Sequence, residues 1–140
     1  MNNTNSISEK KSGYSEYLSL KHRYYIVMAL SKDKEDQLFD CQFFDENGNI
    51  KEGYEGFWFD EKMFLLMEQY FFNFIDDECG LIINMYEEEY IFPEQLSQAI
   101  EIVDRMIPEC DNDEVLELAR KLRALLSKAK ELHTAVGFCF

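Results

Sequence analysis

Carboxylates make up most of the residues in this chain that could do chemistry: 28 of its 140 residues are Asp or Glu, against four Cys and two His. The stretch from Asp45 to Asn49 reads Asp-Glu-Asn-Gly-Asn and resembles the opening of a calcium-binding loop, because oxygen ligands recur at alternate positions. Such a loop needs Gly at its sixth position and Glu at its twelfth, where this chain has Ile50 and Gly56. The stretch is therefore predicted to be a turn and not a cation site.

No other set of residues forms a recognisable catalytic or metal-binding motif. There is no Cys-x-x-Cys pair, and His22 and His133 stand at opposite ends of the chain, which argues against zinc. The chain has neither a Gly-x-Ser-x-Gly motif nor a Gly-rich phosphate loop. Carboxylates are so numerous that any two could meet as an acid–base pair, so their presence carries no information about catalysis. We therefore expect no enzymatic activity, no metal and no cofactor.

The charges are segregated along the chain. Residues 35–117 contain 24 acidic and 3 basic residues, a net charge of −21, whereas residues 1–34 sum to +3 and residues 118–140 to +4, which together give the overall −14. A concentrated negative field repels nucleic acid and anionic membranes and speeds the encounter with a cationic protein. The charge pattern therefore predicts a basic protein partner, and neither nucleic acid nor membrane as a ligand.

Clusters of acidic residues within this segment are the candidate partner-binding residues. One cluster follows a predicted helix, whose negative dipole end disfavours acids by roughly a few tenths of a kcal/mol each. Another is a run of three Glu between two Tyr, a residue type that anchors many interfaces. Each cluster is either a solvated loop or part of an interface. The candidates are Asp45, Glu46, Asp76, Asp77, Glu78, Tyr86, Glu87, Glu88 and Glu89.

Strands are predicted in the first half of the chain. Residues 24–30 form an apolar run rich in β-formers, typical of a buried strand. Residues 38–44 alternate between apolar and polar side chains, which favours a second strand. Asn47-Gly48 then predicts a hairpin with a type I′ turn, because both residues tolerate positive φ. The returning strand should lie within residues 49–59, with bulges at its two glycines.

The first of three predicted helices begins after Asp60, which is placed to accept a hydrogen bond as the N-cap. It runs over residues 61–76 and is apolar over most of its circumference, which is typical of a central helix buried on more than one side. Trp58 stands between two Phe and is expected in the core, as is Tyr90. The residues expected to be buried on this helix include Met63, Phe64, Leu65, Leu66, Met67, Tyr70, Phe71, Phe72, Phe74 and Ile75.

The remaining elements complete an α+β pattern. A short strand is expected at residues 81–85, a helix from Pro93 to near Ile107, and a last helix after a capping box formed by Asp111 and Glu114. The apolar tail, residues 138–140, is expected to pack on the core. Strands followed mostly by helices predict α+β: a small antiparallel β-sheet, with a hairpin near Asn47-Gly48, packed with about three main α-helices.

Length and composition predict one globular domain over residues 14–140 after a polar tail, residues 1–13, that is expected to be disordered. The high aromatic content excludes an acidic disordered chain. No apolar run approaches the 18 residues of a membrane-spanning helix, and the N-terminus lacks the apolar stretch of a signal peptide. The cytoplasm is therefore the expected compartment, where the four Cys are expected to be reduced thiols.

A small, acidic, aromatic-rich α+β chain of this kind resembles the immunity proteins of bacterial toxin systems, in particular those of contact-dependent growth inhibition. The segments that carry the resemblance are residues 57–70 and 87–96, Phe-Trp-Phe-Asp-Glu-Lys-Met-Phe-Leu-Leu-Met-Glu-Gln-Tyr and Glu-Glu-Glu-Tyr-Ile-Phe-Pro-Glu-Gln-Leu. The resemblance implies a stoichiometric inhibitor that binds and neutralises a cognate basic toxin domain, usually a nuclease. It assigns no residue a role.

Three other functions are compatible with the same residues. A nucleic-acid mimic that inhibits a DNA-binding enzyme would need carboxylates at near-phosphate spacing over a long surface. An enzyme with an unrecognised acidic site would need a deep pocket that encloses carboxylates with perturbed pKa values. A scaffold or adaptor subunit is the third. The sequence leaves open the identity of the toxin, the part of it that is covered, the oligomeric state, the strand order and the acidic cluster that forms the interface.

Overall fold

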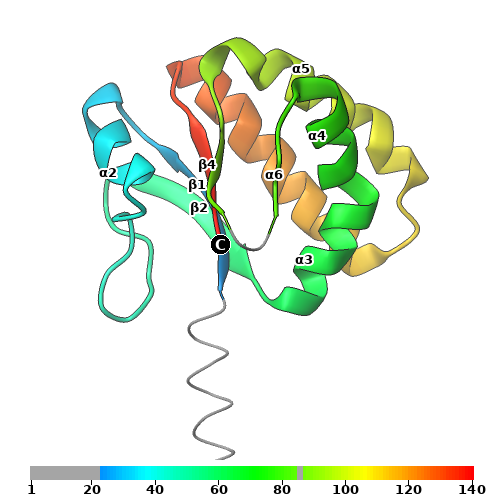
Figure 1. The fold of residues 1–140 in the computed structure, drawn as a ribbon, viewed down its shortest axis with the longest axis horizontal. Helices are drawn as coiled ribbons and strands as arrows, with labels where there is room; N and C mark the ends of the chain where they lie inside the picture. Colours follow the sequence, from blue (N-terminus) through cyan, green and yellow to red (C-terminus); the bar gives the residue numbers. More distant parts are fainter. Residues whose placement is uncertain (1–22, 85–86) are drawn as a thin grey trace, which may run out of the picture.

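The computed structural model describes residues 23–84 and 87–140, which form a four-stranded antiparallel sheet between two unequal layers (Figure 1). The strands are β1 (Tyr24–Ala29), β2 (Tyr54–Phe59), β3 (Glu89–Ile91) and β4 (Val136–Cys139), in the order β2-β1-β4-β3. The α+β class is thus confirmed. The predictions for residues 1–13 and for Met85 and Tyr86 lie outside the described residues.

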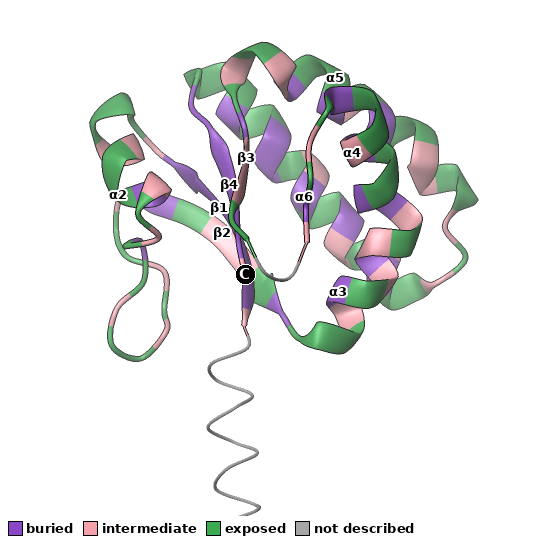
Figure 2. Ribbon diagram, in the orientation of Figure 1, coloured by how far each residue is buried: buried purple, intermediate pink, exposed green. Residues whose placement is uncertain are grey.

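The two central strands are buried on both faces, as Figure 2 shows. Alternate residues of β1 point to opposite sides, so Tyr24, Ile26 and Met28 enter one hydrophobic core and Tyr25, Val27 and Ala29 enter the other. β4 pairs with both β1 and β3, so the apolar C-terminal residues form a central strand of the sheet. The expected packing of residues 138–140 on the core is confirmed for the strand residues Phe138 and Cys139.

The larger core lies between the sheet and the long helices. Asp60 caps the first of them by accepting a hydrogen bond from the Met63 N–H at 2.9 Å, as the sequence predicted. The helices on this side are α3 (Glu61–Met67), a π-helical segment (Glu68–Phe72), α4 (Asn73–Cys79), α5 (Leu96–Met106) and α6 (Asp113–Leu132). The cap of α6 is Asn112, whose side chain accepts from the Val115 N–H, so the predicted capping box at Asp111 was wrong by one residue.

A π-helical segment interrupts the first predicted helix, and a π turn adds one residue to an α-helix. Phe71 and Phe72 both lie within this segment and are fully buried, whereas Phe74 after it is 36% exposed and Leu65 before it is 49% exposed. The predictions that Phe74 and Leu65 lie in the core were therefore wrong. The helix buries one stripe, with Phe64, Met67, Phe71 and Ile75 spaced by three and four residues, and not most of its circumference.

The smaller core lies under α2 (Glu35–Phe39) and the turn that follows it. The strand predicted for residues 38–44 was wrong: its first residues belong to α2, which buries Leu38, and Cys41 has a left-handed φ of 55°. Tertiary packing of Leu38 and Phe43 under the sheet outweighs the alternating pattern. One bridge between Phe44 and Ile50 remains of the expected hairpin.

The predicted turn at Asn47-Gly48 is present, but it is not a type I′ turn. The Gly48 N–H donates to the Asp45 carbonyl at 2.9 Å, and only Gly48 of the turn has positive φ, so the loop has three residues and not the two of a type I′ turn. β2 pairs with β1 without a bulge at Gly56, contrary to prediction. Residues 81–84 form only an isolated bridge, Asn84 with Glu87, in place of the predicted strand.

Candidate functional site

Of the predicted acidic clusters at residues 76–78 and 87–89, the structure brings Asp76 near Glu89, and both of these carboxylates serve the backbone. Asp76 accepts a hydrogen bond from the Ile83 N–H at 2.9 Å, and Glu89 accepts one from the Ile82 N–H at 2.9 Å. These carboxylates thereby hold the segment at residues 81–84 against the end of α4. Burial, with the nearby charges of Glu89, Asp77 and Glu68, raises the pKa of Asp76 to about 6.

The other carboxylates of these clusters differ in their exposure to solvent and in whether they form an ion pair. Glu78 forms an ion pair with Arg105 of α5, so its charge is neutralised within the molecule. Asp77 and Glu87 are exposed, and their carboxylates form no ion pair with any residue that the structure describes. Glu88 is exposed and lies 3.8 Å from the Cys41 thiol. Three of the predicted carboxylates therefore remain as candidate binding groups, and Tyr86 lies outside the described residues.

The predicted pair Asp45 and Glu46 lies on the α2 side of the sheet, away from the helical layer. Asp45 accepts from the N–H groups of Asn47 and Asn49 at 2.8 and 3.0 Å, so it is a turn-forming residue. Glu46 is exposed at the tip. The structure thus separates this pair from the acids at residues 76–89 and gives one of its two residues a local structural role.

Trp58 is a surface residue that the sequence analysis placed wrongly in the core. It is 46% exposed, and the Arg23 guanidinium lies 4.1 Å from the centre of its ring. Arg23 also donates to the Gly48 carbonyl at 3.0 Å, which fixes the guanidinium between the ring and the turn. The alternation of Phe57, Trp58 and Phe59 could have revealed this exposure, because the middle residue of a strand triplet faces away from its neighbours.

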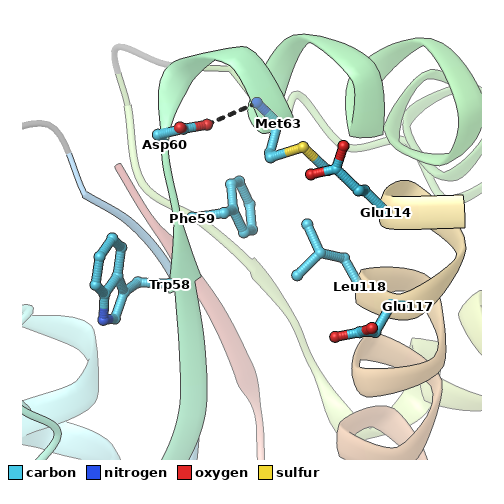
Figure 3. A pocket seen from close by; sticks show the side chains of 7 residues that line it. All are labelled: Trp58, Phe59, Asp60, Met63, Glu114, Glu117 and Leu118. Atoms are coloured by element: carbon cyan, nitrogen blue, oxygen red, sulfur yellow. Dashed lines mark hydrogen bonds between the residues drawn. The ribbon is translucent and has the colours of Figure 1, made fainter. Parts of the chain in front are cut away.

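Beside Trp58, β2 is an edge of the sheet, and three shallow pockets of about 280 to 330 Å³ adjoin it. Figure 3 shows the first: Phe59, Met63 and Leu118 line it, and Trp58 points to the opposite side of β2. The carboxylates of Asp60, Glu114 and Glu117 are its charged groups, and no Lys or Arg of residues 23–84 and 87–140 lines it. Apolar walls with a rim of carboxylates suit an aliphatic side chain that ends in a cation.

The described residues provide neither a metal site nor a membrane-spanning helix. Those residues contain no group of three or more His, Cys, Asp or Glu placed to hold a metal ion. No helix in the described part of the chain combines the length and apolar character needed to span a membrane. The carboxylate-rimmed edge of β2 is thus the strongest candidate site among the described residues, together with the exposed acids Asp77, Glu87 and Glu88.

Comparison with known proteins gives this chain no relative: no protein-family model matches it, and no curated protein or solved structure is significantly similar to it.

Proposed function

We propose that this chain is a stoichiometric inhibitor that binds a cationic protein domain and blocks it, as a bacterial immunity protein does with its cognate toxin. The observation that carries the proposal is that the segregated negative charge is presented to solvent. Among the described residues, ion pairs engage only four acidic side chains: Glu35, Glu55, Glu78 and Asp104. The exposed acids of the helical layer without such a partner include Glu94, Glu101, Glu109, Asp113, Glu114 and Glu117.

A basic toxin domain, and a nuclease in particular, fits this surface. A nuclease must attract phosphate, so its substrate cleft is positively charged, and an acidic protein can occupy that cleft in place of nucleic acid. Electrostatic steering can raise the association rate constant from about 10⁵–10⁶ to 10⁸ M⁻¹s⁻¹ or more. Rapid capture protects a cell whose cytoplasm the toxin enters. Specificity then comes from shape and from a few anchors, because charge alone would accept any basic protein.

Co-expression with the product of a toxin-like neighbouring gene tests the proposal. We expect a 1:1 complex by native mass spectrometry, survival of the cells, and loss of toxin activity in proportion to added inhibitor. An unrelated acidic protein of similar net charge is the control and should not protect. Absence of both complex and protection would overturn the proposal. Inhibition of a DNA-binding enzyme without toxin binding would instead favour a nucleic-acid mimic.

A further inference from the structure

We propose that the outer edge of β2 is the interaction surface, and that it accepts an extended strand of the partner carrying alternating apolar and cationic side chains. The inference rests on the proposed function for its choice of a cationic protein as the partner. Three features of β2 support this surface: the backbone hydrogen-bonding groups at its outer edge, the two faces beside that edge, and the charge of those faces.

The edge offers unpaired backbone groups. The Leu30 N–H donates to the Gly53 carbonyl at 2.9 Å, which identifies this residue pair as hydrogen-bonded. Since such pairs alternate along antiparallel strands, the N–H and C=O groups of Gly56 and Trp58 point away from β1, toward the outer edge. No described residue pairs with that edge. A strand of the partner would extend the sheet there through main-chain hydrogen bonds.

Several devices that normally protect such edges are missing from β2, whose one charged residue, Glu55, is paired with Lys128 of α6. The strand has no Pro, no Lys and no bulge, and it is six residues long. The opposite edge, β3, has only three residues, and its outward Tyr90 N–H donates to the carboxylate of Glu89 at 3.0 Å. β2 is therefore the edge that remains open for pairing.

One face of the added strand would meet a mixed polar and apolar surface. Trp58, Ile50 and Gly56 line a hollow of about 330 Å³ there, together with the polar side chains of Asn49 and Lys121. A side chain at position 56 is impossible, because a Cβ there would lie 2.2 Å from the Ile26 carbonyl oxygen. The hollow is thus kept open by the backbone of this chain, and an apolar side chain from the partner strand can enter it beside the Trp58 ring.

The other face would meet the carboxylates. Successive residues of a strand point to opposite faces, so a neighbour of the apolar residue would point toward the pocket between β2 and α6. There its methylene groups would pack on Met63 and Leu118, and its charge would lie among Asp60, Glu114 and Glu117. Lys121 lines the other two pockets beside Gly56, so the cation is expected at the Trp58 end of the strand.

Charge also distinguishes the partner from a second copy of this chain. Pairing two β2 edges would place two molecules of net charge −14 together and leave both carboxylate pockets without cations. A cationic strand removes that repulsion. The occupant is therefore a basic partner, and self-association through β2 is an outcome that would contradict the proposal.

A fluorescein-labelled twelve-residue peptide of alternating Lys and Val is the probe for the edge. We expect saturable binding at low salt that a Glu–Val peptide does not show, with slower amide hydrogen exchange at Gly56 and Trp58. Since Trp58 is the only Trp of the chain, its fluorescence should change in parallel. Unchanged exchange at these two amides in the saturated complex, or β2-dependent dimerisation of the protein alone, would overturn the proposal.

Variants then separate the backbone, the ring and the charges. Trp58→Thr keeps the N–H and removes the ring, and should weaken peptide binding about tenfold. Trp58→Pro also removes the outward N–H, which β1 does not use, and should weaken binding about a further fivefold. Glu114→Gln with Glu117→Gln should weaken it about tenfold at low salt. The control, Glu101→Gln with Glu109→Gln, removes two exposed charges from the region of α5 and should leave binding within twofold.

The outcomes distinguish this inference from the proposed function. If the β2 variants and the control variant bind the peptide equally, the edge is not the binding surface. If the toxin complex forms and protects cells with the β2 variants as it does with the control, the inhibitor function stands and the proposed surface is wrong. If the peptide binds at β2 but no toxin is neutralised, the edge stands and the function is wrong.

Discussion

The side chain of Asp76, in the last turn of α4, accepts a hydrogen bond from the backbone N–H of Ile83 at 2.9 Å. Ile83 is fully buried whereas its neighbour Ile82 is 64% exposed, so the carboxylate positions a segment that anchors one apolar side chain and exposes the next. The same carboxylate lies near Glu89, which accepts from the Ile82 N–H. Two acids that the sequence suggested as binding groups thus stabilise the loop between α4 and β3.

Stability should fall with rising pH because of Asp76. Burial raises the pKa of Asp76 to about 6, so the folded state binds a proton more tightly than the unfolded state. The contribution is fully present below the unfolded pKa of 3.8, and it is lost as pH rises through about 6. Asp76→Asn, which keeps the acceptor oxygen, should therefore raise the urea midpoint at pH 8 and lose that advantage near pH 4.

The control for this measurement is Asp77→Asn, which removes the same charge from an exposed neighbouring position. It should shift the midpoint less than Asp76→Asn at pH 8. If both variants gave the same midpoint shift at pH 8 and pH 4, the burial of Asp76 would not be the cause.

Two aromatic residues of the first helix should differ sharply in their contribution to stability. Phe71 is fully buried, so Phe71→Ala should reduce the free energy of unfolding by about 3–5 kcal/mol. Phe74 is 36% exposed, so Phe74→Ala should cost about 1 kcal/mol or less. Chemical denaturation of both variants measures the difference. Equal costs would mean that Phe74 is packed in the core as Phe71 is, contrary to the structure.

Gly56 should not tolerate a side chain. The Cβ of Gly56→Ala would lie 2.2 Å from the Ile26 carbonyl oxygen and 2.8 Å from the Val27 Cα, so β1 and β2 would have to separate. We expect a loss of at least about 3 kcal/mol, or failure to fold. Gly80→Ala is the matched control, because its Cβ meets nothing within 4 Å and its left-handed φ of 68° costs about 1 kcal/mol. A Gly56→Ala protein as stable as Gly80→Ala would show that β2 is not packed this closely on β1.

The Cys41 thiol should be unusually reactive for a half-buried thiol. A hydrogen bond from Cys139 lowers the pKa of the Cys41 thiol, and this effect outweighs burial and the nearby Glu88 carboxylate, which act to raise it. The thiolate is the reactive form, so iodoacetamide should modify Cys41 before Cys79, whose pKa burial raises. Peptide mass mapping during alkylation measures the order. In Cys139→Ala the reaction at Cys41 should slow, and an unchanged rate would remove Cys139 as the cause.

Partner association should depend on the exposed acids at residues 87–88. Reversing Glu87 and Glu88 to Lys should slow association with the toxin domain and make it less sensitive to salt between about 50 and about 500 mM, over which the Debye length falls from about 14 to about 4 Å. Glu89 is left unchanged, because its carboxylate accepts from the Ile82 and Tyr90 N–H groups and its reversal would disturb the fold. Stopped-flow association rates test this, and unchanged rates would mean that this cluster lies outside the encounter surface.

Local chemistry in the sequence determined the fold class, the buried strand β1, the N-cap at Asp60 and the approximate positions of the long helices. Each of these depends on contacts between residues close in the chain, or on an apolar period that continues without interruption. The number of carboxylates and their segregation along the chain also come directly from the sequence, and they favour a basic protein as the partner. These features can be predicted from the sequence because they do not depend on contacts between residues that are distant in the chain.

Tertiary packing alone decided the features on which the candidate site depends. The C-terminal strand β4 enters between β1 and β3, and β2 forms an edge of the sheet, where Trp58 is exposed on the face away from α6. Long-range burial of Leu38 and Phe43 replaced a predicted strand by α2, and the first helix buries one stripe against the sheet and leaves Phe74 exposed. Strand order and helix phase are set by which apolar surfaces meet across the whole molecule, and a single sequence read in local windows does not contain that choice.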